Sequence, residues 1–444
     1  MIVTDLSGNT PGPLDGVRVV DFTEYIAGPY GTMMLADMGA DVVKVEPVTG
    51  DHWRHQGSLA NVPNESRVFL GLNRGKRSVA LDAWSERGGD LARRLAAEAD
   101  VVVLNYRPGV AHDLRLDYES VSATNPTVIY AEITAFGHNG PYSHRGGFDL
   151  LSQASAGVMG FEARPRDGTP SGVRSFAPAD LTTAMFNAFG IVNALYRRLV
   201  TGEGQLVSTN LFHSALALQY RPLTSVESED AIEREALIAL VQNARADGAS
   251  YEDTLEIRQI AGGYSPHTNY YRVYQTQDGL VAIACLNNKL RRRLRDLIGS
   301  RDASIDGPVY DPDSLTLSEH HRIRHQMEAA FTERTTEDWL ALLDETGVPA
   351  SPFNETEELY DDPHVLANDL IPTFEHATLG KIRTPRSPIE MSRSTVGVRE
   401  PAPPLGSHTR VVLEELGLDS EEIASLEAEG IALQWHPETA PEEE

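Results

Sequence analysis

Short apolar runs alternate with longer amphipathic segments along the first 135 residues of the chain. Four runs rich in valine and isoleucine have the length of buried strands, at 17–21, 41–45, 101–104 and 127–131. Apolar positions with helical spacing occur at 30–38 and 84–99. Strands that alternate with helices predict a mostly parallel sheet with helices on both faces. We therefore expect an α/β large domain with a Rossmann-like sheet over residues 1–220.

A different pattern begins near residue 225. Residues 225–253 are acidic and helix-prone, as in a connector between domains. The strand-like runs 270–275 and 280–285 flank Asp278-Gly279, a dipeptide typical of hairpin turns, and an arginine-rich helix is predicted over 289–298. These signals predict a linker and a smaller α+β domain over 221–345. Residues 346–444 are expected to form a second linker and a C-terminal segment with two short helices.

The composition restricts the kinds of partner. The chain has 444 residues and a net charge of −27, which argues against nucleic acid and anionic membranes. It contains no apolar run long enough to span a bilayer and no signal-peptide pattern at its start, so we expect a soluble cytoplasmic protein. Cys285 is the single cysteine, which excludes an internal disulfide and a cysteine-based zinc site, and its place in an apolar run predicts a buried thiol.

Asp180 is the first candidate for chemistry. It follows Pro178 at the start of an amphipathic helix, where we expect an N-cap residue. The positive end of the helix dipole should keep a carboxylate ionised there, as a nucleophile requires. Two interpretations of this residue are open: it caps the helix only, or it also attacks a substrate.

Basic residues follow or precede two of the predicted strands. Residues 73–77 read Asn-Arg-Gly-Lys-Arg, and residues 105–109 read Asn-Tyr-Arg-Pro-Gly. Ends of strands are where α/β proteins bind ligands, so Arg107 is suited to bind phosphate and Tyr106 to pack on an adenine. The chain has no GxGxxG after the first strand, no GxSxG and no HExxH, which disfavours a dehydrogenase, a serine hydrolase and a metalloenzyme.

Together these motifs resemble the class III CoA-transferase family, which includes formyl-CoA transferase, carnitine CoA-transferase and the bile-acid-inducible proteins. The matching stretches are 14–22, 27–31, 39–47, 73–77, 105–109, 136–141, the Asp180 helix with 201–205, 278–279 and 404–409. They occur in the family's order along essentially the whole chain. The resemblance implies an interlocked homodimer whose C-terminal segment returns to the large domain.

The resemblance also implies a reaction and a set of site residues. Asp180 is the expected nucleophile that moves CoA from an acyl-CoA to a carboxylic acid, through an aspartyl anhydride and an aspartyl-CoA thioester. CoA then serves as substrate and carrier, with no tightly bound cofactor and no metal. Phe148 and Asp149 are expected near the acyl group, and Gly262 and Gly263 form either a lid over it or a hinge. The expected CoA contacts are Tyr25, Ile26, Ala27, Leu81, Ala83, Trp84, Asn105, Tyr106, Arg107, Leu114 and Gly146.

The chain departs from the family's pattern at several positions. Pro47, Trp84 and Asp113 stand where relatives often carry basic residues, so phosphate binding should depend more on Arg107, helped by Lys76, Arg77 or Arg115. Ile26 replaces a glutamine of formyl-CoA transferase, which suggests a larger or more apolar acyl group.

Two alternative functions are compatible with the same motifs. An α-methylacyl-CoA racemase shares the aspartate but has a histidine where this chain has Phe148, and phenylalanine cannot carry the second proton. A non-catalytic CoA-binding protein of the same fold would explain the missing basic residues but not the presence of Asp180.

Overall fold

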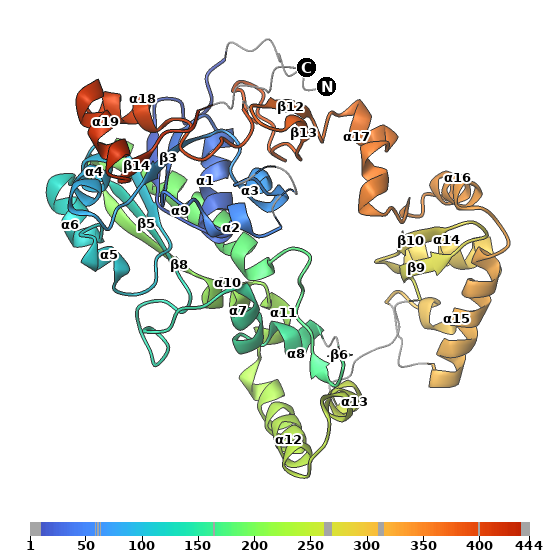
Figure 1. Ribbon diagram of the computed structural model, residues 1–444. Coiled ribbons are helices and arrows are strands. Elements are labelled where there is room, and N and C mark those ends of the chain that lie inside the picture. The colour runs from blue at the N-terminus through green and yellow to red at the C-terminus, as the bar shows by residue number, and fades with distance from the viewer. Residues whose placement is uncertain are drawn as a thin grey trace. The chain divides into compact units, whose positions relative to one another are not determined.

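The computed structural model describes residues 10–57, 59, 62, 64–162, 165–261, 269–309, 315–397 and 400–436. The chain divides into two compact units (Figure 1). The large unit combines Met1–Ala231 with Asp369–Glu444, and the smaller unit is Ile232–Asn368. No helix among the described residues has the length and apolar character needed to cross a membrane.

A mostly parallel sheet forms the centre of the large unit. Among the described residues its strands have the order β14-β3-β2-β1-β4-β5-β8. The parallel strands are β1 (Arg18–Asp21), β2 (Asp41–Glu46), β3 (Lys76–Leu81), β4 (Val101–Leu104), β5 (Ile129–Thr134) and β8 (Gln205–Asn210). The short β14 (Ala432–Leu433) runs antiparallel to β3. The predicted parallel sheet is therefore confirmed.

Alternate strand residues contribute to two separate apolar layers. Val20 and Val43 belong to one layer, and Val19 and Val42 to the other, because successive side chains of a strand point to opposite faces. The first layer is covered by α4 (Glu86–Ala97), α6 (Tyr118–Thr124), α18 (Thr409–Glu415) and α19 (Ser420–Ala428). The second is covered by α1 (Ala27–Asp37) and α9 (Pro178–Thr201).

Helices α1 and α9 approach each other closely at a glycine. A Cβ atom at Gly31 of α1 would lie 3.1 Å from the carbonyl oxygen of Ala184 in α9. The second glycine of the same motif, Gly28, has no room either, because its Cβ would lie 2.2 Å from the Cβ of Thr23. Gly31 therefore allows α1 to pack closely on α9, the helix that contains Asp180, and Gly28 allows α1 to pack against the turn after β1.

Shorter elements connect the sheet to α9 and follow it. Between β5 and α9 lie α7 (Asp149–Ser155), α8 (Val158–Glu162), β6 (Pro165–Arg166) and β7 (Thr169–Pro170). After β8 come α10 (Leu211–Ala217) and α11 (Tyr220–Leu223). The large unit also contains α2 (His52–His55), α3 (Arg67–Leu72), α5 (Val110–Asp113), β12 (Thr373–His376) and β13 (Gly380–Arg383).

The smaller unit has its own core. Antiparallel strands β9 (Tyr271–Gln275), β10 (Leu280–Ala284) and β11 (Ala350–Pro352) pack with α14 (Asn288–Ile298), α15 (Leu317–Phe331) and α16 (Thr336–Thr346). The rings of Tyr274 and Phe331 stack at 4.6 Å inside this core. Cys285 is buried there as predicted, and burial raises the pKa of its thiol to about 11. The remaining helices are α12 (Glu227–Ala246), which crosses the boundary between the units, α13 (Tyr251–Ala261) and α17 (Pro363–Ala367).

Candidate active site

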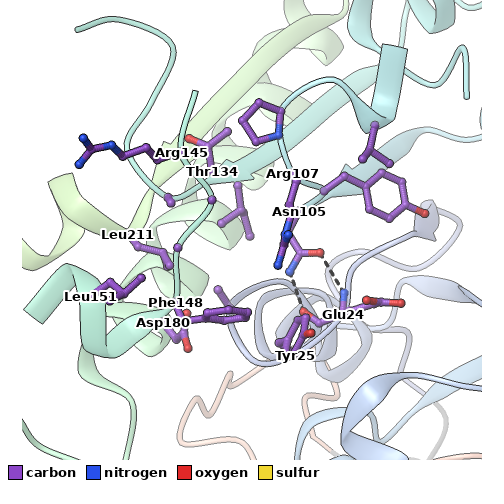
Figure 2. A pocket seen from close by; sticks show the side chains of 18 residues that line it. Glu24, Tyr25, Asn105, Arg107, Thr134, Arg145, Phe148, Leu151, Asp180 and Leu211 are labelled. Atoms are coloured by element: carbon purple, nitrogen blue, oxygen red, sulfur yellow. Dashed lines mark hydrogen bonds between the residues drawn. The ribbon is translucent and has the colours of Figure 1, made fainter. Parts of the chain in front are cut away.

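A cavity of about 660 Å³ opens where β1, β4 and β5 end (Figure 2). The segment after β1 contributes Glu24 and Tyr25, and the segment after β4 contributes Asn105 and Arg107. Asp180 lines the same cavity from the first turn of α9. The carboxyl ends of parallel strands meet at one edge of the sheet, which is the usual ligand site of α/β folds.

Asn105 holds the turn after β1 in place. Its side-chain oxygen accepts a hydrogen bond from the backbone N–H of Glu24 (2.9 Å), and its side-chain nitrogen donates to the carbonyl of the same residue (2.6 Å; Figure 2). The next residue, Tyr25, has a φ of 69°, in the left-handed region that residues other than glycine rarely adopt. The side chain of Asn105 thus helps to stabilise a strained turn that lines the cavity.

Arg107 presents a free cation to the cavity. Its guanidinium forms no hydrogen bond or ion pair with any residue that the structure describes. The side chain passes beside Gly146, where a Cβ atom would lie 3.6 Å from its Nε. Figure 2 shows Arg107 reaching from the end of β4 toward Tyr25. An unpaired guanidinium is suited to bind the phosphate oxygens of a ligand.

Asp180 is the third residue of α9 and does not cap it. The helix begins at Pro178, its N-cap residue is Ala177, and that residue offers no side-chain cap. The cap comes from Asp149, whose Oδ1 accepts the N–H groups of Ala179 (2.7 Å) and Asp180 (3.3 Å). The N-cap prediction for Asp180 is therefore wrong. A carboxylate from the start of α7 already occupies the position at which a cap accepts hydrogen bonds.

The carboxylate of Asp149, which caps α9, is held in place by a hydrogen bond to its second oxygen. Gln153, one turn further along α7, is fully buried and donates from Nε2 to Oδ2 of Asp149 (2.5 Å). The same amide group donates to the carbonyl of Val173 and accepts from its N–H, both at 2.9 Å. The chain leading into α9 is thus fixed to α7 before the helix begins.

The pKa of Asp180 is raised to about 7. Burial is the larger cause, and the neighbouring carboxylate of Asp149 adds to it. The expectation that the helix start keeps this carboxylate fully ionised is therefore wrong near neutral pH. A carboxyl group that releases its proton near pH 7 is still able to act as a nucleophile, because a large fraction is ionised at that pH.

Comparisons with known proteins assign the chain to a family. The model of CoA-transferase family III matches residues 14–409. The chain belongs to CoA-transferase family III. It is 34% identical over 422 residues to the succinyl-CoA:glutarate CoA-transferase of Mus musculus, covering 94% of this chain and 90% of that protein. It is 33% identical over 422 residues to the succinate--glutarate CoA-transferase of Agrobacterium fabrum, with coverages of 93% and 98%.

A solved structure supports the same assignment. A CAIB/BAIF family protein from Brucella suis superposes with a TM-score of 0.70 at 30% identity, covering 91% of this chain and 100% of that one. The protein is thus a CoA-transferase, an enzyme for which CoA is substrate and carrier.

Most of the site residues predicted for this CoA-transferase line two adjoining cavities. The main cavity includes Tyr25, Ala27, Asn105, Tyr106, Arg107, Gly146, Phe148 and Asp180. A second cavity of about 440 Å³ includes Ile26 and Asp149, and it shares Tyr25, Phe148 and Asp180 with the first. The rings of Tyr25 and Phe148 meet edge to face at 5.2 Å. Asp180 therefore faces both cavities beside an aromatic pair.

Four predicted CoA contacts lie outside both cavities. Leu81 and Leu114 are buried in the core layer against which Ala83 and Tyr106 pack, and the side chain of Trp84 is 66% exposed. Their role as CoA contacts stays a prediction. Gly262 and Gly263 lie outside the described residues.

The basic residues Arg74, Lys76 and Arg77 form ion pairs with carboxylates of the same chain. The ammonium of Lys76 lies 2.9 Å from Oδ2 of Asp21, and the guanidinium of Arg77 pairs with Asp41 and Glu415. Burial alone would raise the pKa of Asp21, but Lys76 and Lys44 lower it to about 2, so that pair is ionised. The proposed help of Lys76 and Arg77 in phosphate binding is therefore wrong. Arg115 is exposed and stays a candidate.

Sequence reasoning missed other cavity residues. Glu24 lines the main cavity, and burial, followed by the charge of Asp51, raises the pKa of its carboxyl. Arg145 lines the same cavity with its guanidinium over the ring of Tyr142, and Arg174 lines the second cavity. Two features of the sequence could have indicated these residues. Glu24 follows closely on the end of β1, and Arg145 is next to Gly146, an expected CoA contact. Within the described ranges, no group of three His, Cys, Asp or Glu side chains could hold a metal ion.

Proposed function

We propose that this CoA-transferase moves CoA from an acyl-CoA thioester to a carboxylic acid with Asp180 as the nucleophile. One observation carries the proposal: Asp180 lines both cavities, and one of them is also lined by Arg107, a cation without a partner among the described residues. In this assignment the main cavity takes CoA, with its phosphates near Arg107 and its adenine near Tyr106. The second cavity takes the acyl group.

The chemistry consists of four acyl exchanges. The carboxylate of Asp180 attacks the thioester carbonyl, forming a mixed anhydride and releasing the CoA thiolate. The thiolate attacks the aspartyl carbonyl, forming an aspartyl-CoA thioester and releasing the donor acid as a carboxylate. The acceptor carboxylate then attacks that thioester and forms a second anhydride and thiolate. Finally, the thiolate attacks the acceptor's acyl carbon, which yields the new acyl-CoA and restores the carboxylate of Asp180.

Phe148 supports transfer over racemisation. Its ring lies beside Tyr25 and lines both cavities, at the position where a racemase would carry its second base. A phenylalanine cannot take a proton from the α-carbon of an acyl-CoA. The relatives named above act on succinate and glutarate derivatives by name. Short dicarboxylic acids are therefore the first donors and acceptors that we propose to test.

Chemical trapping tests the nucleophile. The enzyme is incubated with succinyl-CoA and hydroxylamine, which attacks an activated aspartyl carbonyl, and is then analysed by peptide mass spectrometry. We expect a hydroxamate on Asp180 that is absent from Asp180→Ala, whereas the exposed control Asp167→Ala keeps it. Absence of this product across a panel of acyl-CoA donors would reject the proposal. Exchange of the α-proton without CoA transfer would instead favour a racemase.

We also propose that the enzyme is a homodimer, interlocked as the family resemblance implies. Helix α9 supports an interface because its outer face is apolar at helical spacing and exposed. The residues concerned are Met185, Phe189, Val192, Tyr196 and Leu199. An apolar stripe of this length on a helix is typical of a surface that binds another protein chain.

The mass in solution tests this second proposal. We expect twice the chain mass at micromolar concentration by light scattering. Phe189→Asp with Tyr196→Asp should yield the monomer mass, because both side chains are 70% exposed on the stripe. Trp84→Asp serves as the control, since this residue is equally apolar and exposed but follows β3, near the opposite edge of the sheet. A wild-type monomer would contradict the proposal.

A further inference from the structure

The second cavity is lined by an arginine as well as by Asp180. Arg174 lies between β7 and α9 and lines the cavity that also includes Ile26 and Asp180. Its guanidinium forms no hydrogen bond or ion pair with any described residue. The protein has a net charge of −27, so a cation without a partner among the described residues can attract an anionic ligand to this site against the overall field.

Two other polar side chains of this cavity, Asp149 and Gln56, already have partners, whereas the indole Nε1 of Trp53 has none among the described residues. Asp149 accepts hydrogen bonds from Ala179, Asp180 and Gln153, and the side chain of Gln56 donates to His52 (2.7 Å). The remaining lining is mostly apolar or aromatic. Among the described residues of this cavity, Arg174 is thus a cationic side chain that can bind a ligand.

The position of Arg174 is set by contacts of its neighbour. Both backbone groups of Val173 are hydrogen-bonded to the buried amide of Gln153, which also holds Asp149. The same buried amide therefore anchors the cap of the Asp180 helix and the residue before Arg174. A backbone anchored in this way keeps the exposed side chain of Arg174 at the second cavity, so that it can turn toward a ligand there without a costly rearrangement of the backbone.

We infer that Arg174 binds the distal carboxylate of a dicarboxylic acyl group or acceptor acid while the proximal carboxyl carbon reacts at Asp180. This inference rests on the proposed function. With CoA on the side of Arg107, the acyl chain extends into the second cavity, and a second carboxylate at its end can reach the guanidinium of Arg174, which has no partner among the described residues. An arginine forms bidentate hydrogen bonds with a carboxylate, which a monocarboxylic acid of the same length cannot provide.

Matched pairs of substrates test the inference. The pairs are glutarate and valerate as acceptors, and succinyl-CoA and butyryl-CoA as donors; each pair differs in the distal carboxylate. Arg174→Met should lower kcat/KM for glutarate and succinyl-CoA by about 10- to 100-fold, mainly through KM, since one charge-assisted pair is lost. Values for valerate and butyryl-CoA should stay within about twofold or rise. Arg174→Lys should restore part of the loss.

The control is Arg166→Met, a nearby exposed arginine that lines neither of the two cavities at Asp180. It should leave all four values unchanged. An equal loss for both members of each pair in Arg174→Met would mean a structural role, and no loss would mean no contact; either result overturns the inference. The hydroxylamine experiment on the wild-type enzyme separates these outcomes from a failure of the proposed function. If no acyl-CoA leads to a hydroxamate on Asp180, the proposed function is wrong, and the inference about Arg174 is wrong with it.

Discussion

Two carboxylates meet at the amino end of α9, and hydrogen bonds satisfy only one of them. Asp149 accepts from two backbone N–H groups and from Gln153. Among the described residues, none donates a hydrogen bond to the carboxylate of Asp180. This arrangement leaves the oxygens of Asp180 free to attack, and it raises the free energy of their ionised form.

The ionised form of Asp180 should therefore destabilise the fold. Its folded-state pKa of about 7 lies above the ordinary value of 3.8, so between these values the unfolded chain releases a proton that the folded chain keeps. Stability is lost as the pH rises through this window. Asp180→Asn should raise the melting temperature at about pH 8 and have much less effect at about pH 4. The gain has an upper limit of about 4 kcal/mol, which partial solvent exposure reduces.

Calorimetry at the two pH values measures this effect. The matched control is Asp167→Asn, since that side chain is 93% exposed. A stabilisation by Asp180→Asn that is equal at both pH values would show that ionisation is not its cause.

The pH dependence of the reaction follows from the same carboxyl group. We expect kcat/KM for the acyl-CoA to rise as the pH increases through about 7, because the carboxylate is the attacking form. Asp149→Asn removes the neighbouring charge but keeps an oxygen that can accept the helix N–H groups, so it should move the midpoint to lower pH. Glu203→Gln, at an exposed position beyond the other end of α9, should leave the midpoint in place. An unchanged midpoint in Asp149→Asn would contradict the electrostatic explanation.

At the scale of elements, local patterns predicted the sheet but not the contacts that complete the site. The valine runs of β1, β2 and β4 signalled buried strands. Strand β8 lies at the edge of the sheet with alternating exposure, so it carried no comparable apolar run. The start of α9 was predicted from Pro178 and the apolar spacing, whereas its cap comes from a residue on another helix. A pattern within the sequence of α9 therefore could not predict that Asp149 caps this helix.

The packing of α1 on α9 provides a test at this scale. Gly31→Ala should displace the two helices by a few tenths of an ångström, because the added Cβ would lie 3.1 Å from the carbonyl oxygen of Ala184. We expect a loss of about 1–3 kcal/mol in stability and a lower kcat, since Asp180 moves with its helix. Gly71→Ala is the matched control, a helical glycine of α3 with open space around its Cβ position. It should be neutral or slightly stabilising.

At the scale of the whole molecule, the large unit is assembled from both ends of the sequence. One core layer contains Val20 and Val102 together with Leu413 and Ile423. The smaller unit is continuous and keeps a separate core around Ile323. The two cores should therefore respond independently to mutation.

Core truncations test that independence by hydrogen exchange. Leu413→Ala should cost about 2–5 kcal/mol and speed exchange in β3 and β4, with β9 and β10 unaffected. Ile323→Ala, equally buried in the smaller unit, should produce the reverse pattern. Faster exchange in both units from either variant would show that the molecule unfolds as one.

The pairing of β14 with β3 has a consequence for the nascent chain. Ala432 pairs with Leu81, so among the described strands the outer edge of β3 has no partner until residue 432 has left the ribosome. The helices α18 and α19, which cover one apolar layer of the sheet, emerge equally late. Throughout synthesis of the middle region, an open strand edge and an uncovered apolar face are available to other chains. We therefore expect productive folding of this protein to require that those encounters are delayed until β14 is made.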